Sequence, residues 1–138
     1  MFGEAVIFFK PELAIDFKFI RKQGMQLHSK GRFIGAQFEA LLTNDLWRRN
    51  ASHANTMAAL LEKALQKIPN VKITQSVDAN GIFAIFPSSI IPAIQNDHFF
   101  YVWNDKTSEV RLMCSFDTTE ADVDNFIKAI QDQLVAIS

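Results

Sequence analysis

The chain has 138 residues, of which 49% are hydrophobic and 21% are charged, and its net charge is −1. A chain of this length fits one domain that buries roughly two-thirds of the surface its unfolded form exposes, and the composition excludes a disordered protein. The single Cys114 excludes an internal disulfide. No apolar run reaches the ~20 residues of a membrane span, and the N-terminus lacks a signal peptide, so we expect a cytoplasmic protein without membrane contact.

The charges are spread unevenly along the chain. Residues 1–69 contain 10 Lys and Arg against 6 Asp and Glu, whereas residues 70–138 contain 4 against 9. The basic residues are scattered, without the dense runs and interleaved aromatic residues of a nucleic-acid surface. We therefore expect no nucleic-acid partner.

The first segment with a clear pattern is the apolar run of residues 5–9, which precedes Lys10 and Pro11. A continuous β-rich run predicts a strand covered on both faces, as in the middle of a parallel sheet. Parallel neighbours need crossover units, yet this run begins close to Met1. We therefore expect the chain to be part of something larger, or to complete another subunit's sheet. A short helix is predicted from Pro11 to about Gly24.

Two further helices are predicted in the next part of the chain. The first begins at Arg32, and its apolar residues are dense enough that we expect burial on more than one side; Asn44 and Asp45 end it. Over residues 46–68, apolar and small residues alternate in steps of four and three, which predicts one long helix. The residues of this stripe are Trp47, Ala51, Ala54, Ala58, Leu61, Leu65 and Ile68.

The remaining segments predict strands, a short helix and a final helix. The short helix lies within residues 88–96, and Thr118 or Thr119 caps the final helix. The strands are predicted at residues 71–74, 82–86, 99–103 and 110–116. This order predicts the α+β class, with a layer of mostly antiparallel strands covered by helices. We expect residues 1–45 to be a strand and connecting helices left over from a large α/β domain, and residues 46–138 to be a small domain.

Few residues have the spacing of a catalytic or metal site. His28, His53 and His98 lack metal-ligand spacing with one another and with Cys114, so no metal site is predicted. Cys114 lies in a predicted strand, where a cysteine usually serves as a small buried hydrophobe. His53 lies in the middle of a predicted helix and is interpreted as a surface or packing residue.

Arg111 is the most informative charged residue, because it interrupts the apolar run of residues 110–114. A guanidinium in such a strand needs a partner, and its planar fork fits a carboxylate bidentately. The partner is either Asp105, Glu109 or a helix acid, in a structural ion pair, or a ligand. The spacing alone leaves both hypotheses open.

The segment QLHSKGRFIGAQ, residues 26–37, gathers His28, Ser29, Lys30 and Arg32 at the start of a predicted helix. Free N–H groups and the helix dipole favour an anion there. Basic residues that solvate a loop are the alternative, and the sequence alone favours it. Cations in a first helical turn are otherwise slightly unfavourable, which is itself a small hint of an anion.

Four segments, taken in order, resemble the C-terminal part of the low-specificity threonine aldolase and aromatic β-eliminating lyase family. These are pyridoxal-phosphate enzymes with the aspartate-aminotransferase-like fold. The resemblance runs through nearly the whole chain and is carried by GEAVIFF, HSKGRFIGAQ, DANGIFAIF and EVRLMCSFDTTEADVDNFI. It implies a lyase that cleaves β-hydroxy amino acids to glycine and an aldehyde, with pyridoxal 5'-phosphate as cofactor, in a homo-oligomer.

The resemblance also assigns roles to individual residues. Arg111 matches the arginine that grips the substrate carboxylate, and Arg32 matches one that contacts the cofactor phosphate or the substrate. Lys30 and His28 are its companions at the cofactor, and Asn80 matches a position near the site. Many relatives have glycines at residues 28–30, so this chain's substrates are expected to include bulkier β-hydroxy amino acids.

The family's Schiff-base lysine precedes the strand that GEAVIFF matches, whereas the first lysine here, Lys10, follows it. We therefore expect the chain to be a C-terminal fragment without activity on its own. The alternative is a free-standing α+β module that binds an anion or assists assembly without catalysis.

Overall fold

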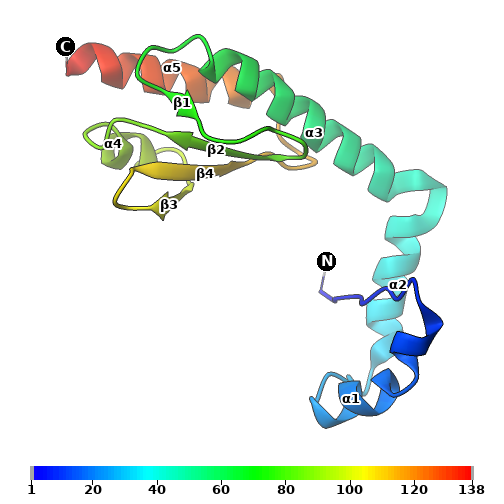
Figure 1. The fold of residues 1–138 in the computed structure, drawn as a ribbon. Helices are drawn as coiled ribbons and strands as arrows, with labels where there is room; N and C mark the ends of the chain where they lie inside the picture. The colour runs from blue at the N-terminus through cyan, green and yellow to red at the C-terminus, as the bar shows by residue number, and fades with distance from the viewer. Residues whose placement is uncertain (1, 138) are drawn as a thin grey trace. The chain divides into compact units, whose positions relative to one another are not determined.

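The computed structural model describes residues 2–137, which divide into two compact units within residues 1–47 and 48–138 (Figure 1). The first unit contains the 3-10 helix η1 (Pro11–Ala14), the helices α1 (Phe17–Gln23) and α2 (Gly31–Leu42), and the 3-10 turn η2 (Thr43–Asp45). No helix of residues 2–137 combines the length and the hydrophobicity that crossing a membrane requires.

The prediction of a strand at residues 5–9 is wrong, because this segment has no strand pairing in the structure. Instead, the chain start packs on α2. The Phe2 N–H donates to Gln37 Oε1 at 2.6 Å. A Cβ atom on Gly3 would lie 2.6 Å from Ile34 Cγ2, so only glycine permits this approach. A strand forms only where a neighbour takes up its backbone hydrogen bonds, and the described strands all lie between residues 72 and 113.

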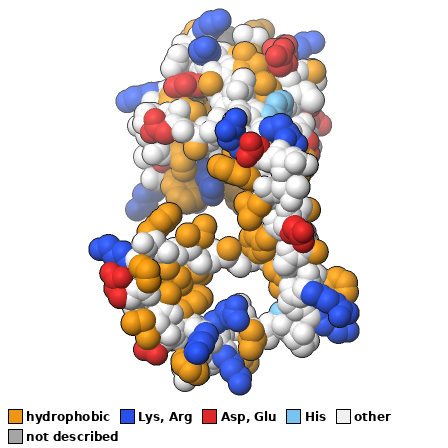
Figure 2. Space-filling model, turned by 90° about the vertical axis from the view of Figure 1, so that its right-hand side faces the viewer, with side chains coloured by type: hydrophobic (Ala, Val, Ile, Leu, Met, Phe, Trp, Pro, Cys, Tyr) orange, Lys and Arg blue, Asp and Glu red, His pale blue; other side chains and the backbone are white. Residues whose placement is uncertain are grey.

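The helices of the first unit differ from the prediction in two respects. The predicted helix of residues 11–24 is split into η1 and α1, although Gly24 does end it, with its N–H donating to the Ile20 carbonyl. We expected α2 to be buried on more than one side, but none of its residues is buried. Figure 2 shows exposed hydrophobic side chains in orange, interspersed with charged side chains in blue and red.

The helix α3 (Leu46–Leu65) confirms the long helix predicted from residue 46. Asn44 and Asp45 have positive φ values of 52° and 57°, so the predicted break before α3 is also confirmed. Asparagine and aspartate tolerate this left-handed conformation better than other residues that carry a Cβ atom. The predicted apolar stripe of α3 is buried from Ala54 onward, whereas Trp47 is 48% exposed.

The second unit is built on one antiparallel sheet with strand order β1-β2-β4-β3. The predicted alternation of helices and strands is confirmed, and with it the α+β class. After α3, the elements are β1 (Lys72–Ile73), β2 (Gly81–Ile85), α4 (Ile91–Gln95), β3 (Tyr101–Asn104), β4 (Glu109–Met113) and α5 (Glu120–Ala136).

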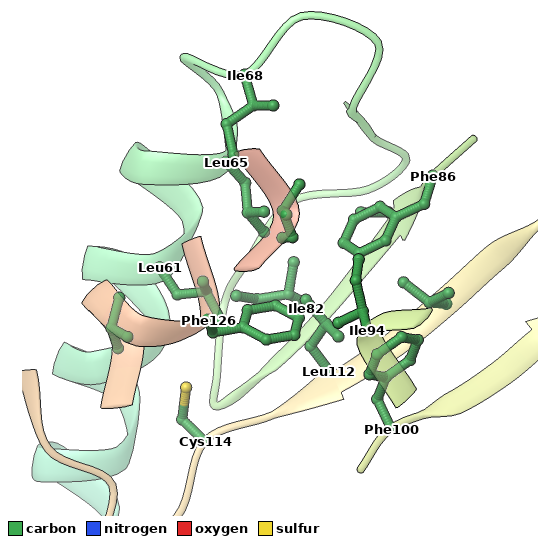
Figure 3. Close-up of a cluster of buried hydrophobic side chains, with 14 of the residues drawn as sticks. Leu61, Leu65, Ile68, Ile82, Phe86, Ile94, Phe100, Leu112, Cys114 and Phe126 are labelled. Carbon is green, nitrogen blue, oxygen red and sulfur yellow. The ribbon is translucent and has the colours of Figure 1, made fainter. Parts of the chain in front are cut away.

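The core of this unit lies between one face of the sheet and the helices. In β4, Val110 and Leu112 are buried, whereas Arg111 between them is on the opposite face. Figure 3 shows buried side chains from α3, β2, β4 and α5 converging on this core. The largest fully buried side chains are Phe86, Leu65, Ile82, Ile90, Ile94, Ile130 and Val110. The helices therefore cover a single face of the sheet, and the side chains of the other face stay accessible.

The final helix, α5, begins with a capping box, and Thr119 is the cap as predicted. Thr119 Oγ1 accepts the Asp122 N–H at 3.2 Å. The Asp122 carboxylate accepts the Thr119 N–H at 2.8 Å and the Thr119 hydroxyl at 2.7 Å. The two residues satisfy each other's backbone donors, which fixes where the helix starts.

These hydrogen bonds from Thr119 lower the pKa of Asp122 below its ordinary value of 3.8. A carboxyl group whose pKa is depressed by folding stabilises the folded state above that value, and the contribution is lost as the pH falls through the folded pKa. We predict that Asp122→Asn flattens the pH dependence of the free energy of unfolding below pH 3.8. Urea unfolding of the full chain, followed by far-UV circular dichroism over a pH series, measures this.

The control is Asp124→Asn, which changes an exposed acid in the same helix and should keep the wild-type slope. An unchanged slope in Asp122→Asn would contradict the prediction.

Candidate functional site

Arg111 lies at the centre of the exposed face of the sheet. In the register of β4, it is paired with Phe83 of β2 on one side and with Tyr101 of β3 on the other. Because side chains alternate along a strand, Arg111 shares its face with Glu109 and Met113. Arg111 is half-buried on the face that the helices do not cover, and both of its partners in the neighbouring strands are aromatic.

Two aromatic rings stand beside Arg111. Its Cζ atom lies over the Trp103 ring, 5.5 Å from the ring centroid. The Trp103 ring in turn meets the Phe83 ring edge-on, with 5.4 Å between the centroids and an interplanar angle of 79°. The guanidinium is thus held by a cation–π contact on an aromatic pair.

The structure also bears on the ion-pair hypothesis for Arg111. Glu109, on the same face of β4, accepts a hydrogen bond from Thr74 Oγ1 at 2.6 Å. Within residues 48–137, no carboxylate forms an ion pair with Arg111, neither Glu109 nor Asp105 nor a helix acid. The charge of Arg111 is therefore not neutralised inside the described part of the second unit, and its donors remain available.

The basic cluster of His28, Lys30 and Arg32 belongs to the first unit. The Lys30 N–H donates to His28 Nδ1 at 3.2 Å, which holds the loop just before α2. Lys30 is the N-cap residue of α2, but no side chain caps the helix. Arg32 lies over the Phe33 ring, 5.1 Å from its centroid. All three basic side chains are exposed at the positive end of the helix dipole.

Asn80, whose role the sequence left open, has a structural position. Its side-chain amide donates to the Cys114 carbonyl at 2.8 Å. The Asn80 carbonyl accepts the Cys114 N–H at 2.9 Å. These two bonds tie the start of β2 to the end of β4, so the amide of Asn80 is already engaged.

A pocket of about 260 Å³ in the second unit was not anticipated from the sequence. His98 lies in its wall, with its ring against Phe126 at 5.2 Å between centroids. Cys114 also lines the pocket, and burial raises the pKa of its thiol. Among residues 2–137, no hydrogen bond joins the side chain of His98 or Cys114 to an acid or a base that would activate a nucleophile. The pocket could not be found from the sequence, because its residues come from segments as far apart as α3 and α5.

His53, the other histidine outside the basic cluster, is exposed on α3, which agrees with its interpretation as a surface residue. His53 Nε2 lies 2.7 Å from the Thr118 carbonyl, which links α3 to the loop before α5. Among residues 2–137, no group of three or more His, Cys, Asp or Glu side chains could hold a metal ion.

Comparison with known proteins identifies relatives over most of the chain. It is 40% identical over 121 residues to a low specificity L-threonine aldolase of Pseudomonas sp. (strain NCIMB 10558), an alignment that covers 88% of this chain and 35% of that protein. It is 38% identical over 116 residues to the low specificity L-threonine aldolase of Pseudomonas aeruginosa, covering 84% of this chain and 34% of the relative. No family model matches the chain.

A solved structure agrees with the sequence comparison. The chain resembles the Leishmania major threonine aldolase with a TM-score of 0.75 and 27% sequence identity, over 88% of this chain and 36% of that one. The fold is therefore that of an α+β region of a threonine aldolase. With the two Pseudomonas relatives, this shows that the chain is a homologue of the C-terminal part of the low-specificity L-threonine aldolases. The chain spans about a third of the length of the curated relatives that it matches.

The raised pKa of Cys114 leads to a prediction about its reactivity. Burial disfavours the thiolate, which is the form that reacts, so the folded chain should be alkylated slowly by iodoacetamide at mildly alkaline pH. In denaturing urea the same thiol should react at least about tenfold faster, because its pKa returns to the ordinary range. Mass spectrometry over time gives both rates on a chain with one cysteine. Equal rates in the folded and unfolded chain would show that Cys114 is accessible.

Proposed function

We propose that the chain is part of a pyridoxal-phosphate-dependent aldolase that cleaves β-hydroxy amino acids, threonine or bulkier analogues, to glycine and an aldehyde. The observation that carries this proposal is the unneutralised guanidinium of Arg111 on the exposed sheet face of a threonine aldolase homologue. An arginine with no acidic partner among the described residues of its unit is suited to an anion from outside it.

In this proposal, Arg111 binds the substrate carboxylate. The planar fork of the guanidinium offers two parallel N–H donors, which fix both the position and the orientation of a carboxylate. Holding the carboxylate fixes the orientation of the Cα–Cβ bond that breaks, and such orientation is a large part of catalysis. The neighbouring aromatic rings lower the local dielectric, which strengthens the charge-assisted hydrogen bonds.

His28, Lys30 and Arg32 are proposed to face the phosphate of the cofactor or the substrate. The donor set fits an anion in kind, since it joins two cations with a helix N-terminus that no side chain caps. Pyridoxal phosphate, when bound, supplies the electron sink for the bond cleavage. In the family resemblance, the lysine that holds this cofactor precedes the GEAVIFF segment. We therefore propose that residues 1–138 bind and orient but do not catalyse alone.

The proposed enzyme is a cytoplasmic homo-oligomer. The support for assembly is the apolar surface of the first unit, where Ile7 is 73% exposed and Phe9 is 93% exposed. Side chains of this size are usually covered in a functional protein.

The protein encoded by the complete reading frame that contains residues 1–138 tests the proposed function. With pyridoxal phosphate added, it should convert L-threonine to glycine and acetaldehyde, and the 138-residue chain alone should not. Acetaldehyde formation is followed by coupled reduction with NADH. A complete reading frame without an upstream α/β region and its lysine, or a complete protein that releases no aldehyde from any β-hydroxy amino acid, would favour the anion-binding module instead.

In that complete protein, Arg111→Ala should lower kcat/KM for threonine at least about thirtyfold, since truncating one partner of a charged pair costs about 2 kcal/mol or more. Arg111→Lys keeps the charge but loses the fork, so an intermediate loss is expected. Arg48→Ala, an exposed arginine of α3, is the matched control and should keep wild-type kinetics. The absorbance of bound pyridoxal phosphate should stay unchanged in all three. Wild-type efficiency in Arg111→Ala would exclude the assigned role.

A further inference from the structure

We propose that Trp103 is a positioning residue, which holds the Arg111 guanidinium in place for the carboxylate of the substrate. This inference rests on the proposed function of Arg111. It adds Trp103, for which the sequence predicted a strand but no role in binding. Its basis is the contact between the two side chains, with the Arg111 Cζ atom 5.5 Å from the centroid of the Trp103 ring.

Trp103 lies at a β-bulge in the pairing of β3 with β4. Val102 pairs with Val110, and Asn104 pairs with Glu109, so Trp103 is an extra residue without a partner in β4. In a regular ladder, Trp103 would lie opposite Glu109. A bulge redirects the side chain of the extra residue and bends its strand, which is why bulges recur next to functional sites. Alternation places Trp103 on the same face of the sheet as Tyr101 and Arg111, and its indole lies against the guanidinium of Arg111.

The Trp103 ring also contacts the ring of Phe83. The two rings meet edge-on at 5.4 Å, and Phe83 is half-buried in the central strand β2. Phe83 also pairs directly with Arg111 in the strand register. Trp103 is 58% exposed and would otherwise sample several rotamers. Contact with a ring on a central strand therefore limits the orientations of Trp103.

The chemical consequence is preorganisation of the arginine. A long arginine side chain loses considerable conformational entropy when it is fixed by a ligand. An aromatic ring that covers one face of the guanidinium restricts it beforehand and leaves the N–H groups at its edge for a carboxylate. Glu109, on the same face, accepts a hydrogen bond from Thr74 Oγ1 at 2.6 Å and forms no ion pair with Arg111 in the described part of the unit. The aromatic pair should thus lower the substrate KM without taking part in bond cleavage.

The test compares aromatic and aliphatic side chains at residue 103 in the complete enzyme. Trp103→Leu should raise the KM for threonine about threefold to tenfold and leave kcat within about twofold, because it removes a contact present in both the ground and transition states. Trp103→Phe keeps a ring and should restore most of the affinity. Phe99→Leu is the matched control, since Phe99 is 83% exposed and packs on Tyr101. It should change neither parameter.

A second measurement needs no activity. In NMR spectra of the 138-residue chain, the Arg111 side-chain resonances should move in Trp103→Leu and stay in place in Phe99→Leu, since only the first change removes the ring over the guanidinium. If Trp103→Leu does not fold, Phe83→Leu probes the same chain of contacts and should raise KM by a smaller factor.

The outcomes separate the two proposals. If Arg111→Lys weakens substrate binding while Trp103→Leu and Phe83→Leu leave KM unchanged, Trp103 has no positioning role and the assignment of Arg111 stands. If Arg111→Lys also has no effect, the carboxylate site itself is wrong. A KM increase that Trp103→Phe fails to reduce would equally overturn positioning by the ring.

Discussion

The arrangement of the second unit depends on a sheet that buries one face only. Side chains alternate along β4, so Val110 and Leu112 enter the core and Arg111 between them lies on the other face. A shift of one residue in the register of β4 would bury the guanidinium and expose two aliphatic side chains. Burying an unpaired charge and exposing apolar surface both cost free energy, so this register is disfavoured. The same packing that stabilises the unit therefore also fixes the position of its most informative charge.

The second unit was predictable from sequence because its signals are local and agree with one another. The small and apolar stripe of α3, the turn before β2 and the Thr119 cap each specify an element that packing then preserves. The face occupied by Arg111 followed from alternation alone. Its surroundings did not, because the cation–π contact with Trp103 depends on how β3 pairs with β4, and the sequence does not state the register of two strands. The pocket beside His98 was missed for a related reason, since it joins distant segments.

The first unit was predicted less well, and the reason is physical. A run of apolar residues such as 5–9 has two sides to cover, and the prediction assumed that neighbouring strands cover them. The described residues supply helices instead: Gly3 approaches Ile34 of α2, and the Phe8 ring meets the Phe17 ring of α1 with 4.8 Å between the centroids. Hydrophobic patterning reports which side chains require burial, not which partner provides it. The exposed apolar side chains of α2 and of residues 5–9 are side chains of this kind, because their pattern predicts burial.

Two groups with a perturbed pKa bear on the proposed function. Among residues 2–137, the Thr119 hydrogen bonds at the helix cap lower the pKa of Asp122, and burial raises the pKa of Cys114, so each shift has a structural cause. An acid or base that moves protons in a reaction is usually perturbed by burial and a charged neighbour at the reacting centre. The side chains to which we assign a ligand are instead two arginines, a lysine and a histidine, and the arginines and the lysine donate hydrogen bonds without giving up a proton. The proposed role of these residues is therefore to bind and orient an anion, not to transfer a proton.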